Sequence, residues 1–465
     1  MKQSGLLIPA IVGSALFMQT LDATIVANAL PTMARDLHED SLRLNLAISC
    51  YFLSSAMFVP LSGWLADKFG ARRVLITAIL VFASASLLCA LSQNLWQLIS
   101  ARVLQGMGGA MMVPVGRLLV LKTAPKSQLV RATAVLTMPA LLGPILGPVV
   151  GGAIVTLTDW RWIFYINIPI GAVGIVLVTL FVPEVSDSHS QRLDARGFLL
   201  VALGLACIVF GMEHAASGAI AIGTSVALAA VGTACLWMYA GHARRRANAI
   251  VNLSLLSIPT YRAALLGGVF TRLVLGASPF LLALLLQNVF GLSALTAGLM
   301  TFTSAAGALF MKTAAPPIIR RFGFRRVLLT NSLTTGGVLM CYALLTEVTP
   351  YAVIVAVLFS AGFFRSLQFT ALGAMAFSDV PTSQMSGASS LSSMGQQLAQ
   401  AMGVAIAAAV LYLMQRADGS ALLTVHQVAP AFVAVGLLSM ISMRFFAQLP
   451  DDAGAEVSGY RPSSS

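Results

Sequence analysis

Long apolar stretches follow one another along almost the whole chain, and they constrain the fold more than any other feature of the sequence. Of the 465 residues, 58% are hydrophobic and 9% are charged, whereas soluble domains carry about 25% charged residues. A larger soluble core does not explain this excess, because single cores stop growing beyond about 250–300 residues. The composition therefore excludes a soluble enzyme and predicts a chain embedded in a lipid bilayer.

Proline, glycine and charge clusters divide the apolar stretches into fourteen candidate membrane-spanning helices, each near the roughly 20 residues that a span requires. They lie at residues 6–30, 44–65, 74–92, 97–121, 131–155, 162–182, 195–213, 219–240, 263–288, 295–318, 327–346, 351–377, 391–414 and 428–446. The sequence thus predicts an all-α polytopic membrane protein with 14 transmembrane helices.

Basic residues gather in alternate connections between these helices. The basic-poor connections hold only Arg35, Arg43, Arg161 and Arg416. Because cytoplasmic loops carry the excess of positive charge, both termini are expected in the cytoplasm. The formal net charge of +12 is spread over short loops rather than gathered on one face, so no nucleic-acid partner is predicted.

No cofactor, metal or nucleotide site is predicted. The five Cys lie within apolar stretches without a CxxC pair, and the five His are scattered along the sequence, so neither has metal-ligand spacing. The sequence has no phosphate-binding loop of the GxxxxGK[ST] type, which argues against a nucleotide-driven pump. No catalytic grouping is apparent either.

One heptapeptide occurs twice, as FGARRVL at 69–75 and as FGFRRVL at 322–328. Both copies fall on the predicted cytoplasmic side, so the two halves are parallel repeats, as where two six-helix bundles face each other across a cavity. The candidate helices at 195–213 and 219–240 are then additional. We expect an N-terminal bundle over 1–183, linkers and two inserted helices over 184–262, a C-terminal bundle over 263–446 and a cytoplasmic tail over 447–465.

Several motifs resemble those of a known family. Residues 63–73 (GWLADKFGARR) are similar to the loop signature of the major facilitator superfamily, and residues 21–31 (LDATIVANALP) to a helix signature of its fourteen-span drug:proton antiporter family. Residues 102–110 (RVLQGMGGA), 143–152 (GPILGPVVGG) and 160–164 (WRWIF) resemble three further motifs of that family. The resemblance implies the major facilitator fold and proton-coupled export of drugs or other small organic molecules across a bacterial inner membrane.

Two positions depart from the family pattern. The family has Asn three residues after the helix Thr, where this chain has Ala27 followed by Asn28. On a regular helix this shift rotates the amide by about 100°, so Asn28 is given no family role. The second loop copy has Arg320 where the first has Asp67, so we expect a charged cytoplasmic lock in the first half alone.

Asp22 is the one acidic residue deep within a candidate helix, because Glu213 lies at a helix end. Charge at membrane depth is costly and marks a functional candidate by default, so we expect Asp22 to bind and release the coupled proton. Arg102 is its expected partner, since a buried guanidinium needs one, and the resemblance places this arginine near the coupling site. The alternative is a permanent structural ion pair.

The loop signature predicts a cytoplasmic gate formed by Gly63, Asp67, Gly70, Arg72 and Arg73. Gly70 permits a sharp turn. Asp67 is expected to cap a neighbouring helix or to pair with Arg72, stabilising one arrangement of the bundles.

Gly143, Gly147 and Gly151 recur at every fourth residue and give one helix a smooth face, which permits close packing in lipid. With Pro148 and Gly152 they form the motif that resembles the antiporter signature. The plain interpretation is packing, and the resemblance adds control of cavity closure.

Arg272 and Arg365 lie within apolar stretches. If they face a central cavity together with Gln105 and Gln396, the cavity favours anionic or zwitterionic cargo over lipophilic cations. The alternative is that both arginines reach out to the membrane surface. That second behaviour is the one expected of Arg117 and Lys312, which lie nearer the cytoplasmic ends.

The sequence as a whole predicts a monomeric secondary transporter that exchanges small organic molecules for protons. One rival function is dedicated export of a single endogenous anionic or zwitterionic metabolite. A rival of another class, a membrane-embedded enzyme or an assembly subunit, is disfavoured. An enzyme needs convergent acid–base groups, and a subunit needs no intramembrane carboxylate.

Overall fold

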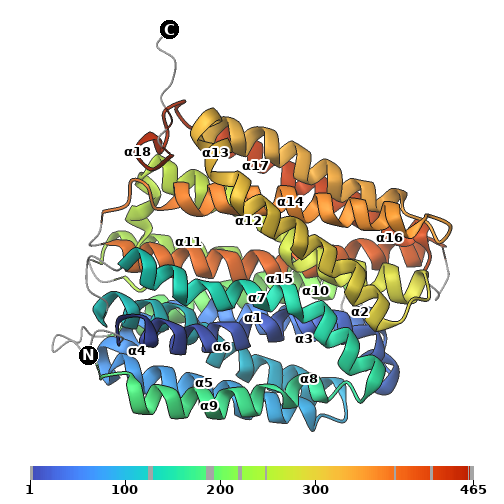
Figure 1. Cartoon of the computed structure of the whole chain (residues 1–465), viewed down its shortest axis with the longest axis horizontal. Coiled ribbons are helices and arrows are strands. Elements are labelled where there is room, and N and C mark those ends of the chain that lie inside the picture. Colours follow the sequence, from blue (N-terminus) through green and yellow to red (C-terminus); the bar gives the residue numbers. More distant parts are fainter. Residues whose placement is uncertain are drawn as a thin grey trace.

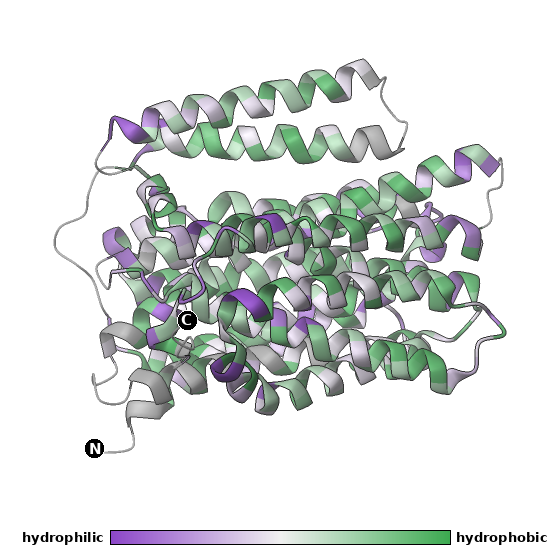
Figure 2. Ribbon diagram, turned by 90° about the horizontal axis from the view of Figure 1, so that it is seen from above, coloured by the Kyte–Doolittle hydropathy of each residue, from purple (hydrophilic) through white to green (hydrophobic). Residues whose placement is uncertain are grey.

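The computed structural model describes residues 4–123, 129–184, 193–217, 222–246, 249–381, 384–418, 423–458 and 460. These described residues form helices and short connections without a strand, and the long helices run side by side (Figure 1). Apolar residues cover most of the helical surface, whereas hydrophilic residues gather mainly near the helix ends (Figure 2). The all-α, multi-pass membrane class predicted from composition is thus confirmed.

The described part of the N-terminal half forms nine helical segments. These are α1 (Ser4–Asp36), α2 (Ser41–Leu44), α3 (Leu46–Phe58), α4 (Leu61–Phe69), α5 (Ala71–Ala90), α6 (Leu95–Thr123), α7 (Leu129–Leu157), α8 (Trp162–Tyr165) and α9 (Asn167–Phe181). Helices α3 and α4 form one rod bent by 55°. Pro60 lies at the bend, where its missing N–H interrupts the helical hydrogen bonds.

The remaining segments make up the middle and the C-terminal half. They are α10 (Ala195–Ser217), α11 (Ile222–Arg244), η2 (Leu253–Ser257), α12 (Pro259–Ala283), the π-helical η3 (Leu284–Val289), α13 (Ala294–Cys341), η4 (Tyr342–Leu344), α14 (Tyr351–Ala376), α15 (Met385–Asp418), α16 (Val425–Met440), α17 (Ser442–Phe446) and α18 (Ala455–Ser458).

Within the described residues, eleven helices are long and apolar enough to cross a membrane, or twelve if the bent α3–α4 rod is one span. The difference from the predicted fourteen lies in two places. Helix α7 shows a shorter apolar stretch, Leu146–Leu157. Helix α13 joins the predicted spans 295–318 and 327–346 through a kink at Gly323. The count of fourteen therefore stays a prediction.

The two copies of the repeated heptapeptide share one backbone turn. Gly70 has φ 91° and ψ 136°, and Gly323 has φ 75° and ψ 161°, a region that residues with a side chain rarely adopt. A side chain at Gly70 would meet the Glu184 carboxylate, and one at Gly323 would meet the Tyr460 ring. Each turn is thus covered by the segment that follows the last long helix of its own half.

Asp194 joins the start of α10 to the residues at the end of α11. Its carboxylate accepts hydrogen bonds from the backbone N–H of Gly197 (3.1 Å) and from Arg246 Nη1 (2.8 Å), and it lies 2.8 Å from His242 Nε2. Burial alone would raise the pKa of Asp194, but the hydrogen bonds and the nearby His242 outweigh it and hold the pKa below its ordinary value.

Candidate functional site

A fully buried ion pair joins α1 to α6. Arg102 Nη1 lies 2.6 Å from Asp22 Oδ2, and both side chains are 0% exposed. Gln105 Nε2 and Asn167 Nδ2 each donate to Asp22 Oδ1 at 2.9 Å, and Arg102 Nη1 also donates to Gln105 Oε1 at 2.6 Å. Buried charges are tolerated when such partners compensate for lost hydration, so the structure brings together the two residues that the sequence paired.

Asn167, which follows the motif at 160–164, is a member of this cluster to which the sequence gave no site role. It begins α9, and its amide also donates to Ser86 Oγ at 2.9 Å, linking α9 to α5. Its position could have indicated a buried role, because the amide lies next to a run of apolar residues just after the motif at 160–164.

Aromatic rings enclose the guanidinium of Arg102. Its Cζ lies 4.2 Å from the centroid of the Tyr51 ring and 5.9 Å from that of the Phe164 ring. A desolvated cation over an aromatic face is attracted to it by about 2 kcal/mol. The ion pair is therefore closed off from water by protein on the sides where these rings lie.

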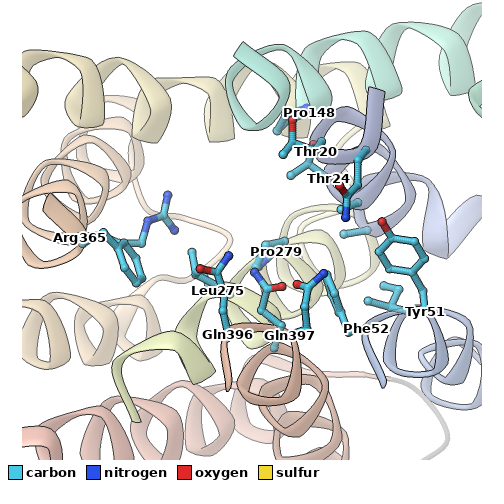
Figure 3. Close-up of a pocket in the computed structure, with 18 of the residues that line it drawn as sticks. Thr20, Thr24, Tyr51, Phe52, Pro148, Leu275, Pro279, Arg365, Gln396 and Gln397 are labelled. Carbon is cyan, nitrogen blue, oxygen red and sulfur yellow. The ribbon is translucent and has the colours of Figure 1, made fainter. Parts of the chain in front are cut away.

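A cavity of about 470 Å³ lies between the two halves of the molecule (Figure 3). Its walls come from α1, α3, α6 and α7 on one side and from α12, α13, α14 and α15 on the other. Arg365 and Gln396, both predicted cavity residues, are among those that line it. Arg365 points into the space from α14 and donates from Nη2 to Ser304 Oγ at 3.0 Å. The neighbouring amides of Gln397 and Gln400 supply further hydrogen-bonding groups.

Two of the predicted cavity residues lie elsewhere. Gln105 is fully buried against Asp22, because it shares one face of α6 with Arg102 three residues earlier. Arg272 is 8% exposed and is not among the lining residues. It lies one turn before the first lining residues of α12, Leu275 and Gly276.

Arg117 and Lys312 line the cavity, although the sequence did not predict them there. We expected both to extend toward the membrane surface, yet both line the cavity. Arg117 Nη1 donates to Ser389 Oγ of α15, and Lys312 Nζ donates to Thr370 Oγ1 of α14 at 3.1 Å. The Arg117 contact is partly buried, whereas the Lys312 contact is exposed.

The charge of the cavity wall is uniformly positive. Arg117, Lys312 and Arg365 line it, whereas none of the described lining residues is acidic. The hydrogen bonds described above join each of the three cations to a hydroxyl group, which carries no compensating charge. Asp22 lies behind the wall with Arg102 and does not neutralise the cavity.

The gate loop makes contacts with the end of the N-terminal half. Arg72 Nη2 donates to the carbonyl of Thr179 in α9, and Arg73 Nε lies 3.6 Å from Glu184 Oε2. A cation is favoured near a helix C-terminus by the partial negative charge there. Asp67 is half-buried, and its clasp with a helix or with Arg72 stays a prediction.

The second loop copy forms the corresponding contact. Arg325, at the position of Arg72, donates from Nη2 to the carbonyl of Ala447, just after α17, at 3.2 Å. Its Nη1 also lies 2.5 Å from Asp451 Oδ1. Each repeat copy is therefore attached to the final helices of its own half.

The glycine face of α7 packs on α1 beside the ion pair. Side chains at Gly143 and Gly147 would collide with Thr20 and Thr24 of α1. Thr24 Oγ1 also donates to the Gly143 carbonyl at 3.3 Å. Gly151 continues this contact along α1, in keeping with close helix packing.

Gly152 and Pro148 contact the other half of the molecule instead. A side chain at Gly152 would meet the carbonyl of Ala294 at the start of α13. A side chain at Gly298 would in turn meet the carbonyl of Pro148. The end of the motif is therefore a backbone-to-backbone contact between α7 and α13.

Asn28, to which the sequence assigned no role, connects four segments at this contact. Its Nδ2 donates to the carbonyls of Pro148 (3.0 Å) and Ala294 (3.2 Å). Gln287 Nε2 donates to the backbone carbonyl of Asn28 (2.8 Å) and to its Oδ1 (3.1 Å). A buried amide with partners on α7, η3 and α13 joins the two halves directly, a role that a motif comparison of α1 alone does not reveal.

The comparisons with known proteins agree with this architecture. The sequence profile of the Major Facilitator Superfamily matches residues 12–404 and 264–459. The "Putative multidrug resistance protein MdtD" of Salmonella newport (strain SL254) is 38% identical over 446 residues, which cover 95% of this chain and 94% of that protein.

Solved transporters share the fold at low identity. The crystal structure of an auto-inhibited POT family peptide transporter has a TM-score of 0.70 at 16% identity, covering 98% of this chain and 99% of the other. A D-xylose–proton symporter has a TM-score of 0.67 at 13% identity, covering 97% and 98%. The chain belongs to the major facilitator superfamily and is a multi-pass membrane transporter of small molecules.

Proposed function

We propose that this member of the major facilitator superfamily exports small organic molecules from the cytoplasm in exchange for protons, in a bacterial inner membrane. The observation that carries the proposal is the buried Asp22–Arg102 pair, an ionisable contact at membrane depth beside a cavity between two halves. Intramembrane carboxylates of this kind mark proton relays in transporters. The relative named as a multidrug resistance protein supports the cargo class.

In the proposed cycle, a proton from outside binds Asp22 and removes its negative charge. Arg102 then loses its ionic partner but keeps the hydrogen bonds to Gln105 and to the Ala47 carbonyl. The weakened contact between α1 and α6 favours the alternative arrangement of the bundles, in which cargo has left and the cavity opens inward. Loss of the proton to the cytoplasm restores the pair.

We further propose fourteen spans arranged as two six-helix bundles, with α10 and α11 inserted between them, in a monomer with cytoplasmic termini. Two observations support this arrangement. Gly70 and Gly323 form matching turns, and Arg72 and Arg325 form matching contacts. The proposed residue ranges are those predicted above.

The test is substitution of Asp22 by Asn, which keeps the shape but removes the titratable group. In inverted membrane vesicles holding a pH gradient, Asp22→Asn is expected to abolish proton-driven movement of cargo per molecule of folded protein in the membrane. Glu347→Gln, a change at an exposed acid, is the matched control and is expected to transport normally. Undiminished transport by Asp22→Asn would contradict the proposal that Asp22 couples transport to protons.

A second candidate function is dedicated export of one anionic or zwitterionic metabolite. The observation that favours it is the cavity wall with three cations and, among its described residues, no acid. A lipophilic cation entering this space would meet uncompensated like charge, whereas a carboxylate would gain charge-assisted hydrogen bonds.

The matched ligands naphthalene-2-carboxylate and 2-naphthylmethylammonium differ in charge but have similar apolar bodies. Arg365→Gln is expected to weaken binding of the carboxylate about tenfold, since a hydrogen bond to a charged group is worth about 1.5–3 kcal/mol. The same substitution is not expected to weaken binding of the ammonium. Isothermal titration of the purified protein measures both, with Arg320→Gln on the exposed part of α13 as control. An equal loss for both ligands, or none, contradicts the anion-export candidate.

A further inference from the structure

Tyr51 lies between the cargo cavity and the buried ion pair. Tyr51 of α3 lines the cavity, and its ring lies 4.2 Å from Cζ of Arg102. Asp22, Arg102 and Gln105 are themselves absent from the cavity wall. Any exchange of protons or contacts between the cavity and Asp22 on this side must therefore pass the Tyr51 ring.

The polar end of Tyr51 has one polar side chain beside it, the amide of Gln19. The hydroxyl is buried, and neither it nor Oε1 of Gln19 meets the distance and angle of a regular hydrogen bond with the described residues. The hydroxyl and Nε2 of Gln19 lie over Gly109, where a Cβ would be 3.1 Å from the hydroxyl and 3.3 Å from Nε2. Because an unsatisfied buried hydroxyl is unfavourable by about 1–3 kcal/mol, the irregular contact with Gln19 holds the ring less firmly than a regular hydrogen bond does.

Residues around Tyr51 also line the cavity proposed to hold cargo. Figure 3 shows the ring projecting from α3 toward Thr20 and Thr24 of α1, on the opposite side of the cavity from Arg365. Gln19 also lines the cavity. A polar group on a bound molecule can therefore compete with Gln19 for the Tyr51 hydroxyl.

We propose that Tyr51 is the positioning residue that separates the cargo cavity from the Asp22–Arg102 pair, and that displacement of its ring opens the carboxylate to the cavity. This inference rests on the proposed proton coupling at Asp22. It adds the side chain through which a bound cargo molecule affects the protonation of Asp22. The attraction between the ring and Arg102 favours the closed position, and a hydrogen bond from cargo to the hydroxyl competes with it.

A test without cargo is covalent labelling of Asp22 by dicyclohexylcarbodiimide, an apolar reagent that reacts with protonated carboxyl groups. The rate is followed at pH 6 by mass spectrometry of the peptide that contains Asp22. Tyr51→Ala is expected to raise the rate about tenfold or more over the unmodified protein. Tyr51→Phe keeps the ring over Arg102 and is expected to stay within about threefold of the unmodified rate.

Phe369→Ala is the matched control, because it removes another ring from the cavity wall, on α14. Its rate is expected to match that of the unmodified protein. Tyr51→Leu replaces Tyr51→Ala if the latter does not yield a monodisperse protein. A Tyr51→Ala or Tyr51→Leu rate equal to the unmodified one overturns the proposal, as does an equal rise in Phe369→Ala. The transport of Asp22→Asn decides the coupling proposal separately.

Discussion

At the scale of residues, Asp22 and Arg102 depend on each other for stability as well as for any role in transport. Both are fully buried, and their remaining hydrogen bonds go to neutral groups such as Gln105 and Asn167. Removing one member of a buried pair leaves an uncompensated charge, which costs about 3–5 kcal/mol, whereas removing both charges together costs much less.

Arg102→Gln alone is therefore expected to destabilise the purified protein by about 3–5 kcal/mol. The double variant Asp22→Asn/Arg102→Gln is expected to recover most of this loss, because no charge is then left without a partner. Thermal unfolding in detergent measures both. A double variant no more stable than Arg102→Gln would show that the two charges do not compensate each other.

The sequence predicted the pairing of Asp22 with Arg102 because opposite charges at membrane depth have few other partners. It did not predict which face of a helix is turned to the cavity. Gln105 was assigned to the cavity and also to the donors of Arg102, and the structure shows the second of these contacts. Lys312 was assigned to the membrane surface, and it is exposed but also lines the cavity. Such orientations depend on how neighbouring helices pack, which the periodicity of one helix does not contain.

At the scale of elements, two glycine turns set the directions of the helices around them. Gly70 separates α4 from α5, and Gly323 breaks the regular backbone of α13. The sequence predicted the turn at Gly70, because glycine takes this backbone conformation without strain, whereas Gly323 entered only as part of the repeated heptapeptide. The break in α13 at Gly323 falls between the helices predicted at 295–318 and 327–346, where the charges at 320–326 indicate a connection.

Gly70→Ala is expected to destabilise the protein by about 1–2 kcal/mol, because a side chain at this positive φ is strained. Gly63→Ala, seven residues earlier in the same motif, is the control. Gly63 lies within α4 with no atom within 4 Å of an added Cβ, so alanine there is expected to stabilise the helix by up to about 1 kcal/mol. Equal unfolding temperatures for the two variants would contradict this account.

At the scale of the whole molecule, the two halves meet through main-chain contacts as well as side chains. Gly152 of α7 approaches Ala294 of α13, and Gly298 approaches Pro148. Asn28 and Gln287 hydrogen-bond across the same junction. A movement that separates the two halves at this end has to break these contacts.

Asn28→Ala is expected to raise the population of molecules open at this junction about tenfold. Of the three hydrogen bonds that its side chain makes, the two that join the halves, with Ala294 and Gln287, are worth about 0.5–1.5 kcal/mol each. Ala294→Cys, introduced after replacement of the native cysteines, reports the opening through its rate of reaction with a membrane-impermeant maleimide. Asn252→Ala, on the linker before α12, is the control for loss of an amide elsewhere. An unchanged rate in Asn28→Ala would show that the amide does not hold the halves together.

The segment after α17 lies against the second repeat turn. Asp451 pairs with Arg325, a side chain at Gly454 would meet Phe324, and Tyr460 covers Gly323. Changes at Asp451, Gly454 or Tyr460 would therefore act on this turn, although these residues are far in the sequence from those that line the cavity. Activity measured on variants of this segment reports on the turn as well as on the segment itself.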